Sequence, residues 1–259
     1  MRLLLKPFQW VYCIYALFTF VAIMIVIFPF VIMASFFGRI RGGNMVMRLC
    51  MLWADIWFAL IFIFFKKIYE APHDKSRAFI FVSNHISYLD AAIIPKAYRQ
   101  PVRPLAKVEM GKVPVFGFIY RNATVTVDRS SVEHRAESVR ILKSIIRKGI
   151  SVLVFPEGTF NMTHRPLKEF YDGAFRVAIE TQTPIKPVLV LDSYSRMNYK
   201  SFFSLNPGRC RIIYLEEIPV EGLTLADTSK LKEKVFVIME NKLKEYKAAW
   251  TKPPALKGG

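Results

Sequence analysis

One short stretch carries residues suited to proton transfer: NHISYLD, from Asn84 to Asp90, which follows the apolar run RAFIFVS. In a continuous helix, the five-residue spacing of His85 and Asp90 is a rotation of about 140°, which turns the two side chains apart. They can meet if His85 lies in the turn after a strand and Asp90 in the first turn of the next helix. Asp90 would then fix one ring nitrogen and leave the other as a base. A carboxylate-oriented base is the core of acyl-transfer chemistry.

Composition alone favours a plainer interpretation of that pair, a helix-capping aspartate beside a core histidine. A second motif, SVLVFPEGTF, shifts the balance. It is a buried-strand pattern in which Pro156 stops the hydrogen-bond ladder and Gly158 permits a sharp turn. Glu157 is therefore predicted at the carboxyl end of a strand, the end that carries ligands in open α/β sheets. The two polar loops are predicted to converge on one edge of a sheet.

The order of these motifs resembles the glycerolipid acyltransferase family, which includes the 1-acyl-glycerol-3-phosphate acyltransferases. The resemblance extends from about Arg77 to Val190 and includes the blocks LAKVEMGKVPVFG, TVTVDR and IKPVLV between and after the two motifs. It implies direct transfer of an acyl group from a thioester to a glycerol hydroxyl, without an acyl-enzyme. One departure follows FPEGT, where the family often has arginine or serine and this chain has Phe160.

The resemblance implies that His85 is the base and Asp90 its orienting partner. It assigns Arg129, at the end of TVTVDR, to phosphate binding, and a fixed charged fork suits a phosphate. The alternative for Arg129 is an ion pair with Asp128 or a solvated loop charge. Lys107, after another strand-like run, is a second candidate cation, although exposed lysines are common on any surface.

The FPEGT motif supplies the remaining candidates for substrate binding. Glu157 is expected to hydrogen-bond the glycerol hydroxyl or to organise the pocket, while Gly158 and Thr159 offer backbone and hydroxyl contacts. The absence of the family's arginine implies that some phosphate affinity comes from elsewhere. A basic cluster lies just downstream, although a solvated loop explains it slightly better; its members are His164, Arg165 and Lys168.

Ser87 is a possible nucleophile, but a structural role is favoured because hydroxyls in such turns usually bond to backbone. No metal site is predicted, since no further His or Cys lies at ligand spacing near His85. Three scattered cysteines form neither a metal motif nor a disulfide framework. Their scatter agrees with a reducing, cytoplasmic location for the catalytic domain.

The N-terminal part predicts membrane attachment. No charged residue occurs from Pro7 to Gly38, which is longer than the roughly 20 apolar residues that a membrane span needs. Pro29 is expected to kink or end this helix. A second apolar run, 49–65, contains Asp55 and is interpreted as a tilted span, a re-entrant arm or an interfacial helix. The family resemblance implies that such a pair can be a two-helix arm in one leaflet.

From Arg77 onward, strand and helix patterns alternate, which predicts an α/β fold with a mainly parallel sheet flanked by helices. Strands are expected at 78–83, 102–106, 123–127, 151–155, 185–191 and 209–215, and helices most clearly at 132–148, 173–182 and 229–250. The predicted organisation is a membrane-anchoring helical segment over 1–70, with a flexible glycine break near residue 42, followed by an acyltransferase domain over 71–259.

The net charge of +17 suggests attraction to anionic lipid headgroups. Nucleic acid is a less suitable partner, because the chain has no nucleic-acid motif and a membrane anchor. The resemblance therefore predicts a membrane O-acyltransferase of phospholipid synthesis that converts lysophosphatidic acid to phosphatidic acid. Acyl-CoA or acyl carrier protein would be its co-substrate, with no further cofactor. The alternatives are another lysolipid acceptor, such as a lysophospholipid or lyso-ornithine lipid, and a catalytically silent lipid-binding protein of the same fold.

Overall fold

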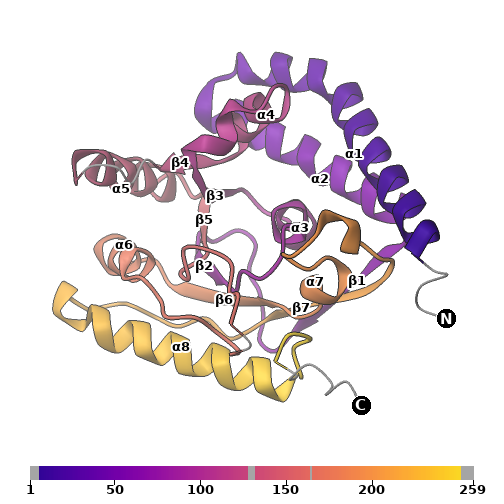
Figure 1. Cartoon of the computed structure of the whole chain (residues 1–259). Coiled ribbons are helices and arrows are strands. Elements are labelled where there is room, and N and C mark those ends of the chain that lie inside the picture. The colour runs from indigo at the N-terminus through magenta and orange to yellow at the C-terminus, as the bar shows by residue number, and fades with distance from the viewer. Residues whose placement is uncertain (1–5, 128–131, 164, 252–259) are drawn as a thin grey trace, which may run out of the picture.

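The computed structural model describes residues 6–127, 132–163 and 165–251. One mostly parallel sheet forms its centre (Figure 1). The strands are β1 (Ile63–Tyr69), β2 (Ile80–Ser83), β3 (Val102–Lys107), β4 (Val125–Val127), β5 (Ser151–Val154), β6 (Ile185–Val190) and β7 (Gly208–Tyr214). The helices are α1 (Lys6–Ser35), α2 (Gly43–Leu60), α3 (Leu89–Ala97), α4 (Phe116–Ala123), α5 (Val132–Ile146), α6 (Gly173–Thr181), α7 (Ser193–Arg196) and α8 (Thr228–Glu245).

The strand order is β1-β7-β6-β2-β5-β3-β4, and only the β6–β7 pair is antiparallel among the described strands. The predicted mainly parallel α/β fold is therefore confirmed. Every residue of β2, β5 and β6 is buried, as expected for continuous apolar strands covered on both faces. β2 and β5 are central neighbours, so the loops that follow them leave the same edge of the sheet.

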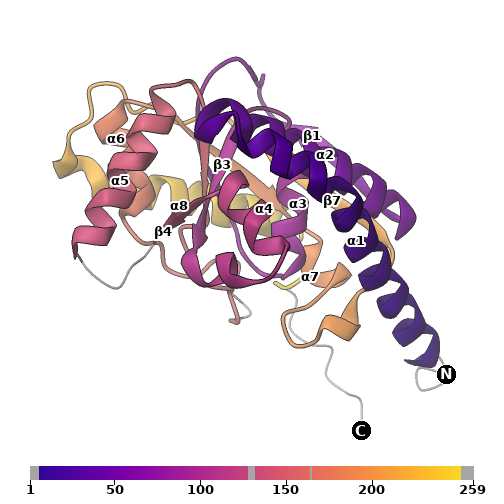
Figure 2. The ribbon, with the colours of Figure 1, turned by 90° about the horizontal axis from the view of Figure 1, so that it is seen from above.

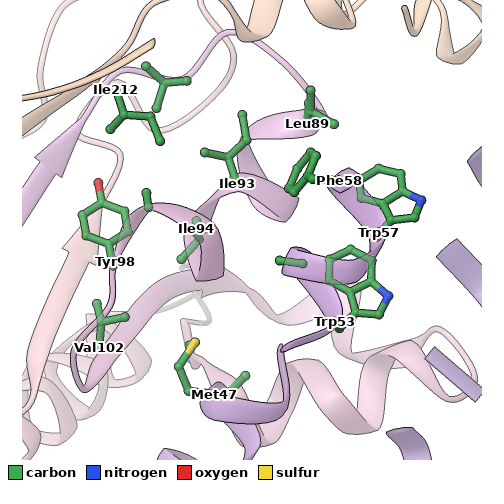
Figure 3. Close-up of a cluster of buried hydrophobic side chains, with 14 of the residues drawn as sticks. Met47, Trp53, Trp57, Phe58, Leu89, Ile93, Ile94, Tyr98, Val102 and Ile212 are labelled. Atoms are coloured by element: carbon green, nitrogen blue, oxygen red, sulfur yellow. The ribbon is translucent and has the colours of Figure 1, made fainter. Parts of the chain in front are cut away.

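Helices cover both faces of the sheet and divide its core in two. In Figure 1, α1, α2 and α3 lie on one side and α6 and α8 on the other. Figure 3 shows how α2 meets α3 on the first side, with Trp57 and Phe58 beside Leu89 and Ile93. This contact fixes the position of α3, the helix that carries Asp90.

The N-terminal arm, α1 and α2, is packed against the sheet domain (Figure 2). The buried Arg103 of β3 donates to the carbonyls of Arg39 and Ile40 and to Oδ1 of Asn44, so it holds the turn between the two helices. That turn is a π-helical segment, Gly38–Gly42. A Cβ at Gly42 would lie 2.3 Å from the carbonyl oxygen of Ala34, so this glycine serves a close approach.

Three sequence expectations need adjustment. α1 continues past Pro29 to Ser35, so the proline does not end the helix. The apolar run 49–65 is the end of α2 followed by the start of β1, because the chain turns at Ile61 and Phe62. β1 joins the sheet through β7, so the sheet begins before residue 71, where the sequence pattern placed the domain boundary.

α1 is long and apolar enough to cross a membrane, judged by length and composition. It is the one such helix in the described part of the chain. Most of its large apolar side chains are exposed, including Phe8, Val11, Phe18 and Val26. This exposure distinguishes α1 from a core helix of the domain, and it makes the helix a candidate membrane segment.

Candidate active site

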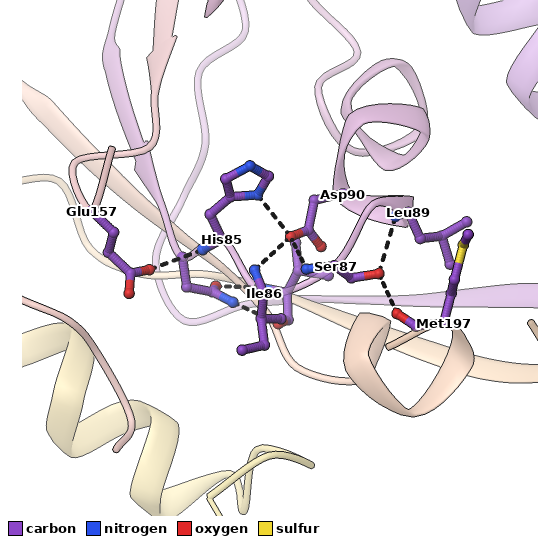
Figure 4. Close-up of polar contacts among 9 residues, drawn as sticks. His85, Ile86, Ser87, Leu89, Asp90, Glu157 and Met197 are labelled. Carbon is purple, nitrogen blue, oxygen red and sulfur yellow. Dashed lines mark hydrogen bonds and ion pairs between the residues drawn. The ribbon is translucent and has the colours of Figure 1, made fainter. Parts of the chain in front are cut away.

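The turn after β2 brings His85 and Asp90 together. Asp90 lies in the first turn of α3, and its Oδ2 is 3.0 Å from Nδ1 of His85 (Figure 4). The Asp90 side chain is 1% exposed, whereas that of His85 is 20% exposed. The contact forms through the strand–turn–helix arrangement that the sequence spacing required.

Oδ2 of Asp90 also accepts the backbone N–H groups of Ile86, at 2.8 Å, and Ser87, at 2.9 Å. These bonds fix the carboxylate at the helix N-terminus, where the helix dipole favours negative charge. With the Asp90 carboxylate accepting from Nδ1–H, the proton-accepting nitrogen of neutral His85 is Nε2. The geometry therefore suits a general base whose tautomer is fixed by a buried carboxylate.

The loop after β5 supports the same turn through Glu157. Oε1 of Glu157 accepts the N–H of His85 at 2.9 Å, and Oε2 accepts the N–H of Lys168 at 2.9 Å. The carboxyl group is fully buried, and burial raises the pKa of Glu157 to about 7, although the two N–H donors oppose that rise. Both carboxylate oxygens of Glu157 thus hold backbone N–H groups, one in each of the two segments that it joins.

Aromatic rings hold the His85 imidazole from two sides. Phe155 stacks on it at 4.2 Å between ring centroids, and Phe160 meets it edge-on at 4.4 Å. Phe160 also contacts Tyr88 at 4.8 Å. The position where the resembled family often has arginine is therefore part of an aromatic wall beside the candidate base.

The rest of the FPEGT loop turns sharply around Gly158, whose φ of +72° favours glycine. Thr159 is exposed, and its Oγ1 accepts from Nζ of Lys168 at 2.8 Å. Lys168 thus contacts both Glu157 and Thr159 of this loop. Arg165, another member of the basic cluster, is exposed.

The predicted phosphate contacts are less well defined. Arg129 and His164 lie outside the described residues, so their predicted roles remain predictions. Lys107 is exposed at the carboxyl end of β3. Pairing of Pro104 with Leu153 puts Lys107 at the same edge of the sheet as Glu157. Within the described residues, no group of three or more His, Cys, Asp or Glu side chains could hold a metal ion.

Ser87 faces the protein interior. Its hydroxyl donates to the carbonyl of Met197 and accepts the N–H of Leu89 at 3.0 Å, which secures the start of α3 (Figure 4). This fully buried side chain is engaged in structural hydrogen bonds, in agreement with the favoured structural interpretation.

Sequence reasoning missed two asparagines that shape the site. The Asn84 amide donates to the carbonyl of Val190 at 3.0 Å and accepts its N–H at 2.9 Å, which ties the turn to β6. The backbone N–H of Asn161 donates to the carbonyl of His85 at 2.8 Å. The sequence does indicate the Asn84 contact, because an amide side chain directly follows a buried strand. The Asn161 contact joins two loops that are distant in sequence, and no sequence pattern predicts it.

Comparison with known proteins gives concordant results. A family model described as Acyltransferase matches residues 65–191. An uncharacterised acyltransferase of Schizosaccharomyces pombe is 30% identical over 66% of this chain and 62% of its own length. A probable 1-acyl-sn-glycerol-3-phosphate acyltransferase of Mycoplasma pneumoniae is 33% identical over 48% of each chain. The human 1-acyl-sn-glycerol-3-phosphate acyltransferase alpha is 30% identical over 62% of this chain and 56% of its own length.

The chain thus spans between 48% and 62% of the length of these three relatives. The crystal structure of the 1-acyl-sn-glycerophosphate acyltransferase from Thermotoga maritima superposes with a TM-score of 0.72. It is 23% identical, and the match covers 97% of this chain and all of that one. At this identity the likeness concerns the fold alone.

Proposed function

This chain belongs to the glycerolipid acyltransferase family through the domain of residues 65–191, and from that premise we propose that it transfers a fatty acyl group to the hydroxyl of a lysolipid. The observation that carries the proposal is the His85–Asp90 pair at the end of β2, beside the loop that holds Glu157. Lysophosphatidic acid is the proposed acceptor, phosphatidic acid the product, and acyl-CoA or acyl carrier protein the donor.

The proposed chemistry uses His85 twice. Nε2 of His85 takes the proton of the acceptor hydroxyl while the hydroxyl oxygen attacks the carbonyl carbon of the thioester. The C–O bond forms, the C–S bond breaks, and the thiolate leaves with the proton that His85 returns. Asp90 stabilises the transient imidazolium and holds its ring in place. The aromatic wall of Phe155 and Phe160 keeps water from that side of the base.

Recognition of the acceptor phosphate is proposed to depend on Arg129, with Lys107 and Lys168 as further cations at the same edge of the sheet. The resembled family's arginine is replaced by Phe160, so Arg129 would carry an unusually large share of phosphate binding. A charge-assisted contact of this type contributes about 1.5–3 kcal/mol. The apolar contacts of Phe160 with His85 and Tyr88 also favour a second candidate, an acceptor without a terminal phosphate.

The membrane assignment is part of the same proposal. We place α1 in the bilayer and the catalytic domain on the cytoplasmic side, where its three cysteines are free thiols. Membrane lipids are then both the environment and the source of the acceptor.

The deciding experiment is an acyl-transfer assay with purified membranes, a panel of lysolipids and both donor types. Lysophosphatidic acid should be the preferred acceptor, and Arg129→Ala should lower its kcat/KM roughly ten- to a hundred-fold with little change in donor KM. Phe160→Arg should raise the preference for lysophosphatidic acid over a lysolipid without a terminal phosphate, whereas the matched control Phe160→Leu should leave it unchanged.

The possible results separate the candidates. If the wild-type protein prefers a lysolipid without a terminal phosphate, the assignment as an acyltransferase stands and the assignment of phosphatidic acid as its product is wrong. Absence of transfer to every acceptor, from both donors, would favour the silent lipid-binding protein.

A further inference from the structure

The segment 198–206, between α7 and β7, carries two exposed phenylalanines, and we call it the phenylalanine loop. Phe202 is 62% exposed and Phe203 53% exposed, both in a single 3-10 turn, Phe202–Ser204. Two adjacent phenylalanine side chains that are mostly exposed to water forgo the hydrophobic gain that burial of their rings would give. Their exposure therefore needs a partner surface.

The loop is held in this shape by its own hydrogen bonds. Oγ of Ser201 accepts the N–H of Phe203 at 3.1 Å, and Oγ of Ser204 donates to the carbonyl of Ser201 at 2.6 Å. The Asn206 amide donates to the carbonyls of Ser195, Arg196 and Ser204. Because the backbone is fixed, the two rings project outward as part of a defined surface.

This surface is continuous with the candidate membrane helix. Phe203 meets Trp10 of α1 at 6.0 Å between ring centroids, and Trp10 is 58% exposed. Sγ of Cys13 donates to the carbonyl of Leu205, so α1 and the loop are also joined beneath the rings. Lys6, Gln9, Trp10, Asn198, Ser201 and Phe203 line a groove between them.

The mixture of side chains fits the boundary between headgroups and acyl chains. Aromatic rings, amides and hydroxyls are typical of that zone, where one end of a surface is apolar and the other is wet. No Asp or Glu occurs between Asp192 and Glu216, while exposed Lys200 and Lys6 flank the rings. Such a surface is complementary to an anionic leaflet.

We propose that the phenylalanine loop is a second membrane-docking element, which inserts Phe202 and Phe203 into an anionic phospholipid leaflet beside the first turns of α1. It lies next to the candidate site, since Phe202 stacks on Tyr88 at 4.4 Å and Tyr88 contacts Phe160. Docking would therefore hold the His85 side of the domain against the lipid surface. The inference does not depend on the proposed activity, because the surface exists whichever lysolipid is used.

The test places an environment-sensitive fluorophore on a single introduced cysteine in the full chain. Phe202→Cys and Phe203→Cys report the loop, Phe18→Cys reports the exposed face of α1, and Val237→Cys on α8 is the matched exposed control. Wild-type protein gives the labelling background of the native cysteines. Vesicles of phosphatidylcholine and phosphatidylglycerol with brominated acyl chains quench only probes that reach the apolar layer.

Quenching at positions 202 and 203, comparable to that at position 18 and absent at 237, is the expected result. Probes at 202 and 203 that stay unquenched while position 18 is quenched would overturn the proposal. Loss of quenching at position 18 would overturn it too, because the loop is proposed to dock beside α1. Equal quenching in vesicles of phosphatidylcholine alone would refute the anionic leaflet, and a concentration-dependent blue shift without vesicles would indicate a second copy of the chain instead.

Discussion

Asp90 combines two tasks in one oxygen, since Oδ2 contacts the His85 ring and also accepts two backbone N–H groups. The residue that orients the base is therefore also the residue that shapes the turn around it. This sharing ties the orientation of the His85 ring to the shape of the turn. It also means that a change at Asp90 acts on the base through geometry as well as charge.

Removal of the proposed base should abolish turnover, and removal of its partner should lower turnover strongly, in both cases without unfolding the chain. We expect no transfer by His85→Ala, and a loss of roughly 10² or more in kcat for Asp90→Asn because the ring loses its correct tautomer. Initial rates on membrane preparations, with folding checked by circular dichroism, measure this. Asp172→Asn is the matched control, since this half-exposed residue pairs with Lys232 of α8 and contacts neither His85 nor Asp90 in the hydrogen bonds and ion pairs of the described residues. Near-normal turnover by well-folded His85→Ala would refute the mechanism.

Glu157 should make stability depend on pH. Burial raises its pKa from 4.5 to about 7, so the folded chain binds this proton more tightly than the unfolded chain does. The stabilising effect of the proton is complete below about pH 4.5 and is lost as the pH rises towards 7, a change of about 3 kcal/mol. Stability should therefore fall with rising pH more steeply in wild type than in Glu157→Gln.

Denaturant unfolding of both proteins between pH 4 and 8 isolates that contribution, because all other groups titrate alike in the two chains. A constant difference in unfolding free energy across that range would show that the pKa of Glu157 is the same in the folded and unfolded chains, and would contradict the prediction.

At the scale of elements, α1 is the helix whose surroundings matter most. Its exposed apolar side chains, together with its contacts to α2, describe a helix that packs on one side and leaves the other side for lipid. Hydrogen bonds from Trp53 and Trp57 of α2 to carbonyls of α1 join the two helices. We therefore expect α1 and α2 to associate with the membrane together.

Attachment through α1 should resist salt. Burial in hydrocarbon is not screened by ions, whereas attraction of a basic domain to headgroups is. We expect the full chain to stay in the membrane pellet after carbonate and after high-salt washing. A peripheral basic protein provides the control that high salt releases. Release of this chain by salt alone would mean that its attachment is electrostatic and that α1 lies outside the hydrocarbon.

The elements also show what the sequence could and could not predict. Apolar strand-like runs identified six described strands. The meeting of His85 with Asp90 was predicted from their spacing together with the FPEGT motif and the family resemblance. β1 was missed because its apolar half continues the apolar pattern of α2, with only the turn at Phe62 between them. α4 was missed because the eight-residue stretch FGFIYRNA is too short for a clear helical period. Contacts between loops, such as Asn161 with His85, leave no periodic signal at all.

At the scale of the whole molecule, the arm and the sheet form one connected body. Arg103 holds the turn between α1 and α2, and β1 continues directly from α2 into the sheet. The sequence pattern suggested a membrane anchor followed by a separate domain. In the structure, the arm continues into β1, which is an edge strand of the sheet. The orientation of α1 in a bilayer therefore fixes the orientation of the candidate site.

The place of β1 also has a consequence for biosynthesis. Ile63 pairs with Gly208, so the strand leaves the ribosome long before its partner β7 exists. At usual translation rates the wait is on the order of ten seconds. During that interval the arm has already emerged, while the hydrogen-bonding edge of β1 and its Phe64 side chain remain open to mispairing. The sheet is therefore completed at this edge only when the C-terminal part of the chain has been made, so truncation before β7 would leave β1 permanently unpaired.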